Sequence, residues 1–128
     1  MCHQTVSLTA RALEQAGIAT VVIGSAYDIV TCCGVPRFLF NDLPLGNPLG
    51  IPGDRDMQHE TVKIGLELVA SAKAPGTVVQ TPFKWSDDES WKDNYGRVDD
   101  SNREALKRMG EENRRRRVEN REKGLTRQ

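Results

Sequence analysis

The sequence lacks the features that mark membrane and secreted proteins. No stretch approaches the roughly 20 consecutive apolar residues of a transmembrane helix, and the first residues lack the basic-then-apolar order of a signal peptide. Its three cysteines are Cys2, Cys32 and Cys33, and two of them are adjacent, unlike the spaced cysteines of a secreted disulfide framework. These absences predict a cytoplasmic protein with reduced thiols and no membrane partner.

Motifs that bind nucleic acids, phosphates and metals are also missing. The arginine run Arg114–Arg117 lies among glutamates with no interleaved aromatic residue, which favours a solvated helix over a nucleic-acid contact. The glycine-rich stretch 46–53 is interrupted by prolines and lacks the Gly-Lys-Ser/Thr ending of a phosphate-binding loop. Cys32 and Cys33 lack the spacing and the further ligands of a structural zinc site. We therefore expect no nucleic-acid partner, no metal and no cofactor.

The length and the charge distribution predict one globular domain followed by a charged tail. A chain of 128 residues is long enough for one domain of ordinary size and too short for two. The net charge of zero hides an asymmetry, because residues 1–98 carry 8 basic and 11 acidic side chains, whereas residues 99–128 carry 10 and 7. We predict a globular α/β domain over 1–98 and a helical or partly disordered tail over 99–128.

Apolar periodicity and turn residues predict alternating helices and strands in the first part of the chain. Four elements are expected in this order: a helix over 5–16, a strand over 18–23, a helix over 25–34 and a strand over 37–40. The first helix would bury Val6, Ala10 and Leu13, and the second would run from Ser25 to a left-handed cap at Gly34. This alternation predicts a small layered α/β fold of the Rossmann-like or flavodoxin-like type, with right-handed crossovers and a parallel sheet between flanking helices.

The next segments continue this pattern. Three prolines and three glycines within residues 41–53 exclude helix and strand there, and Asp54 would cap a long helix that ends at Lys73. Gly65 would let this helix pack closely. Its buried stripe would comprise Met57, Thr61, Ile64, Leu68 and Ala72. Residues 77–81 predict a short edge strand, and the two tryptophans that follow are expected to lie across the core.

The three cysteines differ in their expected reactivity. The thiolate is the reactive form of cysteine, and the amide dipoles at the start of a helix favour it. Cys2 is placed for this effect, and His3 beside it could supply positive charge or move a proton. A residue so near a chain end is also often without any role, and the residues alone leave both alternatives open. Cys32 and Cys33 stand in the last turn of their helix and are predicted to be small core residues.

A resemblance to a known family is carried by three segments: CHQTVSLTARALEQAGIATVVIGSAYDIV, CGVPRFLFNDLPLGNP and TPFKW. Over residues 2–98 the chain resembles the carboxy-terminal part of the selenoprotein B subunits of the glycine, sarcosine and betaine reductases and of D-proline reductase. The resemblance implies reductive cleavage of a carbon–nitrogen bond in one of these substrates or in a related small amine. A selenol or thiol attacks carbon in this chemistry, and a dithiol system restores it.

The resemblance also implies a role for Cys2 and the need for a partner. In that family a cysteine or selenocysteine stands three residues before the cysteine that matches Cys2, which makes Cys2 the second, resolving thiol. The sequence begins after that position, which leaves two expectations open. One is a split or truncated form, in which a partner subunit supplies the missing sulfur or selenium and covers an open sheet edge, and the other is a shortened family member without turnover. Self-association into a homo-oligomer is the other way to cover that edge.

The substrate pocket is expected at the ends of the strands. Gly24, Ser25 and Asn47 follow strand ends, and we expect them to line a pocket for a small amino-acid-like substrate. The alternative function, from another class, is a non-catalytic interaction subunit with structural cysteines and a charged tail that binds a partner protein.

Overall fold

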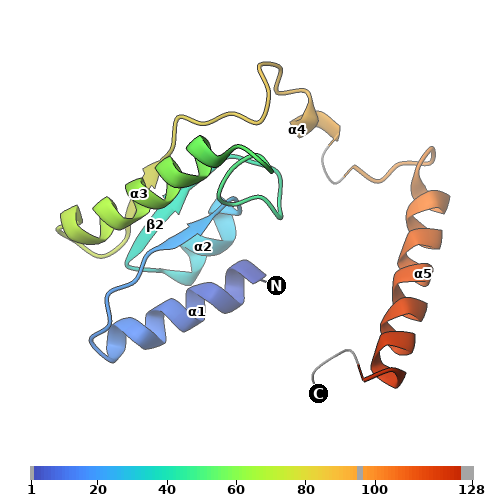
Figure 1. The fold of residues 1–128 in the computed structure, drawn as a ribbon, viewed down its shortest axis with the longest axis horizontal. Helices are drawn as coiled ribbons and strands as arrows, with labels where there is room; N and C mark the ends of the chain where they lie inside the picture. Colours follow the sequence, from blue (N-terminus) through green and yellow to red (C-terminus); the bar gives the residue numbers. More distant parts are fainter. Residues whose placement is uncertain (1, 95–96, 125–128) are drawn as a thin grey trace. The chain divides into compact units, whose positions relative to one another are not determined.

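The computed structural model describes residues 2–94 and 97–124 and divides the chain into two units, Met1–Glu89 and Ser90–Gln128. The elements of the first unit are α1 (Cys2–Gln15), β1 (Val22–Gly24), α2 (Tyr27–Cys33), β2 (Arg37–Phe40), α3 (Arg55–Ser71) and β3 (Thr77–Gln80). The second unit contains α4 (Trp91–Asn94) and α5 (Arg103–Glu122). The α/β class predicted from the sequence is confirmed (Figure 1). The predicted functional division into 1–98 and 99–128 stays a prediction.

The sheet has three parallel strands in the order β1-β2-β3. The central strand β2 spans the predicted residues, and its Phe38 and Leu39 are fully buried. The edge strand β3 also lies where the alternating pattern predicted it. β1 is shorter than predicted, because Gly17 and Ile18 close the end of α1: the N–H of Ile18 donates to Leu13 O at 3.0 Å. Residues 18–21 therefore form a connection, not the first half of a strand.

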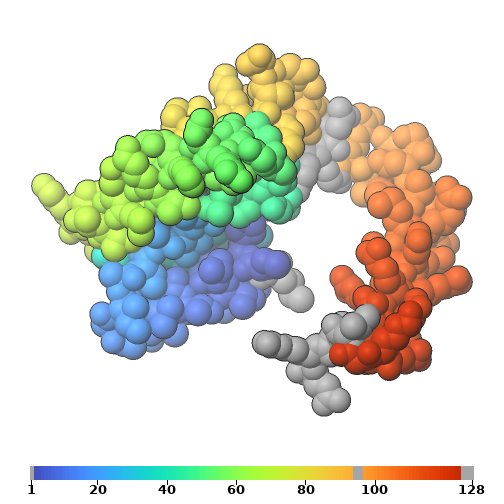
Figure 2. Space-filling view, viewed as in Figure 1, coloured from blue at the N-terminus to red at the C-terminus, as the bar shows by residue number. Residues whose placement is uncertain are grey.

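The helices cover both faces of the sheet. Phe38 packs in the core with Val30 of α2, whereas a Cβ atom at Gly65 of α3 would lie 3.7 Å from Cδ2 of the next strand residue, Leu39. Because successive strand residues point to opposite faces, α1 and α2 lie on one face and α3 on the other (Figure 1). In the space-filling view α3 (green) and α1 (dark blue) accordingly lie on different sides of the first unit (Figure 2). Two right-handed crossovers along the order β1-β2-β3 would put α2 and α3 on the same face. The prediction of right-handed crossovers is therefore wrong for one of the two connections.

The long helix α3 begins where predicted and ends at Ser71, two residues before the predicted end at Lys73. Asp54 Oδ1 accepts a hydrogen bond from a backbone N–H of the first turn at 3.0 Å, which caps the helix. Thr61 and Leu68 of the predicted stripe are buried. A Cβ atom at Gly65 would lie 3.2 Å from Ile23 Cδ1, so glycine at this position permits the close approach of α3 to β1.

The buried face of α1 differs from the predicted one. Val6 and Leu13 are 45% and 38% exposed, whereas Ser7 and Ala10 are buried. Ser7 can be buried because its hydroxyl donates to His3 O at 2.7 Å, one turn earlier in the same helix. A polar residue satisfied within its own helix is invisible to an apolar pattern, and the predicted stripe is wrong at Val6 and Leu13 for this reason.

Two predictions for α2 are also corrected. Ser25 does not cap this helix, because the cap position is Ala26 and makes no side-chain hydrogen bond. Cys32 is exposed and Cys33 is half-buried, so neither is a core residue. A helix of seven residues presents little surface to the core, and Val30 is the residue that α2 buries. The predicted left-handed cap at the end of α2 is confirmed.

The second unit is dominated by α5, which buries none of its residues. The arginines Arg114–Arg117 are exposed, as expected of a solvated helix. Trp91 belongs to this unit and Trp85 is half-buried, so neither tryptophan belongs to the buried core that both were expected to cross. Within the described residues, no helix is both long and apolar enough to span a bilayer.

Candidate active site

A cleft of about 400 Å³ opens at the carboxyl end of β1, beside the start of α1. Its lining residues are Cys2, His3, Val6, Ile23, Leu45, Gly46 and Pro48. One wall is the first turn of α1, and the other is the loop that connects β2 to α3. Clefts outside the carboxyl ends of parallel strands are the usual ligand sites of α/β sheets. The position of the cleft alone therefore marks it as a candidate site.

Cys2 is the first residue of α1, and its side chain is exposed. The first turn of α1 contains no acidic side chain, and the first amide groups of a helix have no acceptor within the helix. An electrophile in the cleft can therefore reach the sulfur, at the helix end where the amide dipoles favour negative charge. The structure thus places Cys2 at a helix start and in a cleft.

His3 is held against the end of β1. Its Nε2 accepts a hydrogen bond from the backbone N–H of Ser25 at 3.2 Å. Nε2 is the acceptor in this geometry, which leaves Nδ1 as the ring nitrogen that can carry a proton. A Cβ atom at Gly24 would lie 2.8 Å from His3 Cδ2, so a larger residue there would displace the imidazole. The structure therefore brings the predicted residues Gly24 and Ser25 to His3.

The predicted residues Ser25 and Asn47 do not belong to the lining of the cleft. Ser25 Oγ is buried, and none of the described residues offers it a hydrogen bond. Asn47 does not line the cleft, although its neighbours Gly46 and Pro48 do. The N–H of Asn47 donates to Pro44 O at 3.1 Å, and its carbonyl accepts from the N–H of Gly50. Asn47 thus shapes the loop through its backbone, and its predicted place in a substrate pocket stays a prediction.

The other two cysteines lie away from this cleft. They border a separate cleft with Gln4, Asp28 and Ile29. His3 contacts the start of α2 at Ser25, whereas Arg11 Nη1 donates to Cys33 O at 3.0 Å at the end of α2. A seven-residue helix is about 10 Å long, so Cys33 lies roughly one helix length from the cleft of Cys2. Among the described residues, the cleft contains one thiol, and no cluster of potential ligands could hold a metal ion.

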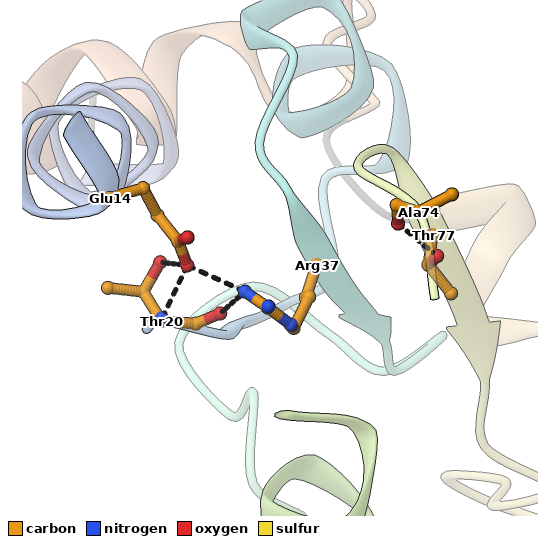
Figure 3. A network of polar contacts seen from close by, with 5 residues as sticks. All are labelled: Glu14, Thr20, Arg37, Ala74 and Thr77. Carbon is orange, nitrogen blue, oxygen red and sulfur yellow. Dashed lines mark hydrogen bonds and ion pairs between the residues drawn. The ribbon is translucent and has the colours of Figure 1, made fainter. Parts of the chain in front are cut away.

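A polar network connects β2 to α1 at the end of the sheet opposite the cleft (Figure 3). Arg37 Nη1 donates to Glu14 Oε1 at 2.7 Å and to Thr20 O at 3.3 Å. The N–H and the hydroxyl of Thr20 donate to the same Glu14 oxygen. These Thr20 hydrogen bonds, with the Arg37 guanidinium, hold the pKa of the Glu14 carboxyl below its usual range. Since Arg37 opens β2, this network stabilises the fold at the end of the sheet remote from the cleft.

Several residues of the site were not predicted from the sequence. Val6 was expected in the core, and Leu45 and Pro48, which lie in the same loop as the predicted pocket residue Asn47, were not named individually. Asn41, which follows β2 directly, was not singled out, although it is fully buried and bonded to Pro48. Its signal was a polar side chain placed immediately after the apolar residues Phe38–Phe40 of a strand, at the end of the sheet where α/β sites form.

Comparison with known proteins supports part of the resemblance inferred from the sequence. The chain is similar to the D-proline reductase subunit gamma of Acetoanaerobium sticklandii, with 27% identity over 84 residues. These residues make up 66% of this chain and 35% of the relative, so the chain spans about a third of that subunit's length. No family model matches the sequence, and no solved structure matches it. The chain is thus similar to a reductase subunit, and membership of the selenoprotein B family stays a prediction.

Proposed function

We propose that this chain is a thiol-dependent reductase domain in which Cys2 is a redox-active residue. The reaction is the reductive cleavage of the carbon–nitrogen bond of D-proline, glycine, sarcosine, betaine or a related small amine. The observation that carries the proposal is an exposed cysteine at the start of α1, in a cleft at the carboxyl end of a parallel strand. The similarity to a D-proline reductase subunit supports a reductase over other thiol chemistry.

The reaction requires a second sulfur or selenium atom. A first thiolate or selenolate attacks carbon and displaces the amine nitrogen, which leaves with the bonding electrons and a proton. Cys2 then attacks that sulfur or selenium, and the carbon leaves with the electron pair and takes up a proton. The product is a disulfide or a selenenyl sulfide, which an external dithiol reduces. Because the described cleft contains one thiol, we propose that a partner subunit supplies the first atom.

The walls of the cleft suit the carbon portion of a small substrate. Val6, Ile23 and Leu45 are apolar, and no charged side chain belongs to the described lining. The carboxylate of an amino acid would therefore be bound by groups outside this lining, which also favours a partner subunit. Since Nε2 of His3 is engaged by the N–H of Ser25, Nδ1 is the atom through which His3 would move a proton.

A non-catalytic interaction subunit is the second candidate. The exposed apolar residues on one helix favour it, since Val6, Leu8 and Leu13 of α1 are each more than a third exposed. The structural role that this alternative assigns to the cysteines has less support, because Cys2 and Cys32 are both exposed.

The test is turnover by the chain together with the polypeptide that carries the other sulfur or selenium. The purified chain is mixed with candidate partner subunits from the same genome, a dithiol and each small amine. Turnover is measured as the released amine or, for D-proline, whose nitrogen stays in the product, as the ring-opened amino acid. We expect turnover with the intact chain and with Cys32→Ser, and none with Cys2→Ser. Equal turnover by Cys2→Ser and by the intact chain would sink the assignment, and binding without turnover in every mixture would favour the interaction subunit.

A further inference from the structure

Asn41 connects the strand ends to the loop that forms one wall of the cleft. It is fully buried and follows β2 directly, and its backbone N–H donates to Gly24 O at 2.9 Å. Its side-chain Nδ2 donates to Pro48 O at 3.0 Å and to Thr61 Oγ1 at 3.4 Å, and its Oδ1 accepts from the Thr81 hydroxyl. Because a carbonyl oxygen can only accept, the Pro48 contact fixes the orientation of the amide.

The contact with Pro48 matters because of where Pro48 lies. Leu45, Gly46 and Pro48 form the wall of the cleft opposite the first turn of α1. They belong to a loop without helix or strand between β2 and α3 (Figure 1). The Asn41 side chain joins this wall to the sheet. Its backbone also holds the carbonyl of Gly24, the residue packed against His3. One buried residue thus contacts both sides of the site.

We propose that Asn41 is a positioning residue for the thiol cleft: its carboxamide sets the separation between the loop wall and Cys2. This inference rests on the proposed function of Cys2. It identifies the Asn41 hydrogen bond to Pro48 as the contact that determines the width of the cleft. Asn41 is too deeply buried to touch a substrate, so it acts through Pro48. The competing explanation is that its hydrogen bonds stabilise the fold without any effect on the cleft.

Two variants separate these explanations. Asn41→Asp keeps the shape of the side chain and the acceptor for Thr81, but replaces the donor to Pro48 with an oxygen. Thr81→Val is the matched control, because it removes another bond of the same amide and leaves the bond to Pro48. Both are made in a Cys32→Ser/Cys33→Ser background, where Cys2 is the remaining cysteine. The measurements are the thermal midpoint and the rates at which N-phenylmaleimide and iodoacetamide modify Cys2.

The ratio of the two rates reports the width of the cleft, because one reagent is bulky and the other small. We expect Asn41→Asp to change this ratio by about fivefold, which corresponds to the net free energy of one hydrogen bond. Thr81→Val should lower the thermal midpoint and leave the ratio unchanged. An unchanged ratio in Asn41→Asp overturns the proposal. If Asn41→Asp does not fold, Asn41→Ser, which introduces no charge, takes its place under the same criterion.

The background protein distinguishes failure of this inference from failure of the proposed function. If Cys2 in that protein reacts with both reagents as a cysteine in a short unfolded peptide does, the cleft has no influence on the thiol. Both the proposed function and the role of Asn41 then fall. If Cys2 differs from the peptide and Asn41→Asp leaves the ratio unchanged, only the role of Asn41 falls.

Discussion

His3 Nε2 accepts a hydrogen bond from the backbone N–H of Ser25 at 3.2 Å, which joins the start of α1 to the end of β1. Since Cys2 and His3 are consecutive, this bond also determines where the thiol lies relative to the sheet. The site therefore depends on a junction between two elements that are separated by more than twenty residues in the sequence.

Replacing Gly24 with alanine should disturb this junction. The new Cβ atom would lie 2.8 Å from His3 Cδ2, so the imidazole must move away from Ser25. We expect a loss of about 1–3 kcal/mol in the free energy of unfolding, measured by urea denaturation. Gly110→Ala in α5 is the control, because its Cβ atom meets only Arg114 Nη1, at 4.0 Å, and no destabilisation is expected. A Gly24→Ala protein as stable as the parent would contradict the close packing of His3.

Cys2 should react faster than Cys32, although both are exposed. Cys2 opens a helix and Cys32 lies in the last turn of one, so the amide dipoles favour the anionic sulfur of the first and oppose that of the second. We expect iodoacetamide at pH 7 to modify Cys2 several-fold faster, as followed by mass spectrometry of proteolytic peptides. Denaturation in guanidinium should bring the two rates together. Equal rates in the folded protein would contradict the argument that the helix start makes the Cys2 thiol more reactive.

Glu14 should contribute a stability that depends on pH. Its pKa is lowered in the folded state, chiefly by the hydrogen bonds from Thr20 and then by Arg37, so folding favours the ionised carboxyl. The contribution is fully present above the unfolded pKa of about 4.3 and is lost as the pH falls through the lower folded value. Glu14→Gln should therefore be destabilised at pH 7, with the difference from the parent shrinking below about pH 4.

The measurement for Glu14 is urea unfolding between pH 7 and pH 3. Glu60→Gln is a suitable control, because Glu60 forms an exposed pair with Lys63 on α3 at 3.3 Å. Exposed pairs of this kind contribute little, and the control should match the parent across the series. A Glu14→Gln protein whose deficit does not change with pH would argue against the hydrogen-bonded carboxylate.

Removing the Asp54 side chain should weaken the start of α3. Asp54 Oδ1 accepts the N–H of Met57 at 3.0 Å, and loss of such a cap costs about 0.5–2 kcal/mol. We expect Asp54→Ala to lower the thermal midpoint, whereas Asp54→Asn, which retains an acceptor oxygen, should lie close to the parent. If the two variants are equally destabilised, the charge of Asp54 is more important than its hydrogen bond.

Local signals in the sequence predicted those elements whose causes are local. These local causes are the compact run Arg37–Phe40 that became β2, the caps at Gly34 and Asp54, and the prolines of the β2–α3 loop, and each acts within a few residues. Cys2 was expected beside a helix start, but the helix predicted over 5–16 begins three residues earlier, at Cys2 itself.

The remaining features depend on contacts between distant segments. Ser7 is buried because its hydroxyl is satisfied within α1, and Cys32 is exposed because α2 is short, neither of which appears in an apolar pattern. The handedness of the β–α–β crossovers and the walls of the cleft are determined only when the strands assemble into the sheet. Asn41 shows this most clearly, since its partners lie on the loop, on α3 and after β3.

The central strand β2 is four residues long, and polar networks fix both of its ends, through Arg37 at its start and Asn41 just beyond its finish. Such a strand has little freedom to shift along its axis. A larger or smaller ligand would therefore be accommodated by movement of the loop between β2 and α3 and by fraying of the first turn of α1. The strands beneath the cleft would keep their positions while the loop and the helix start on either side of it move.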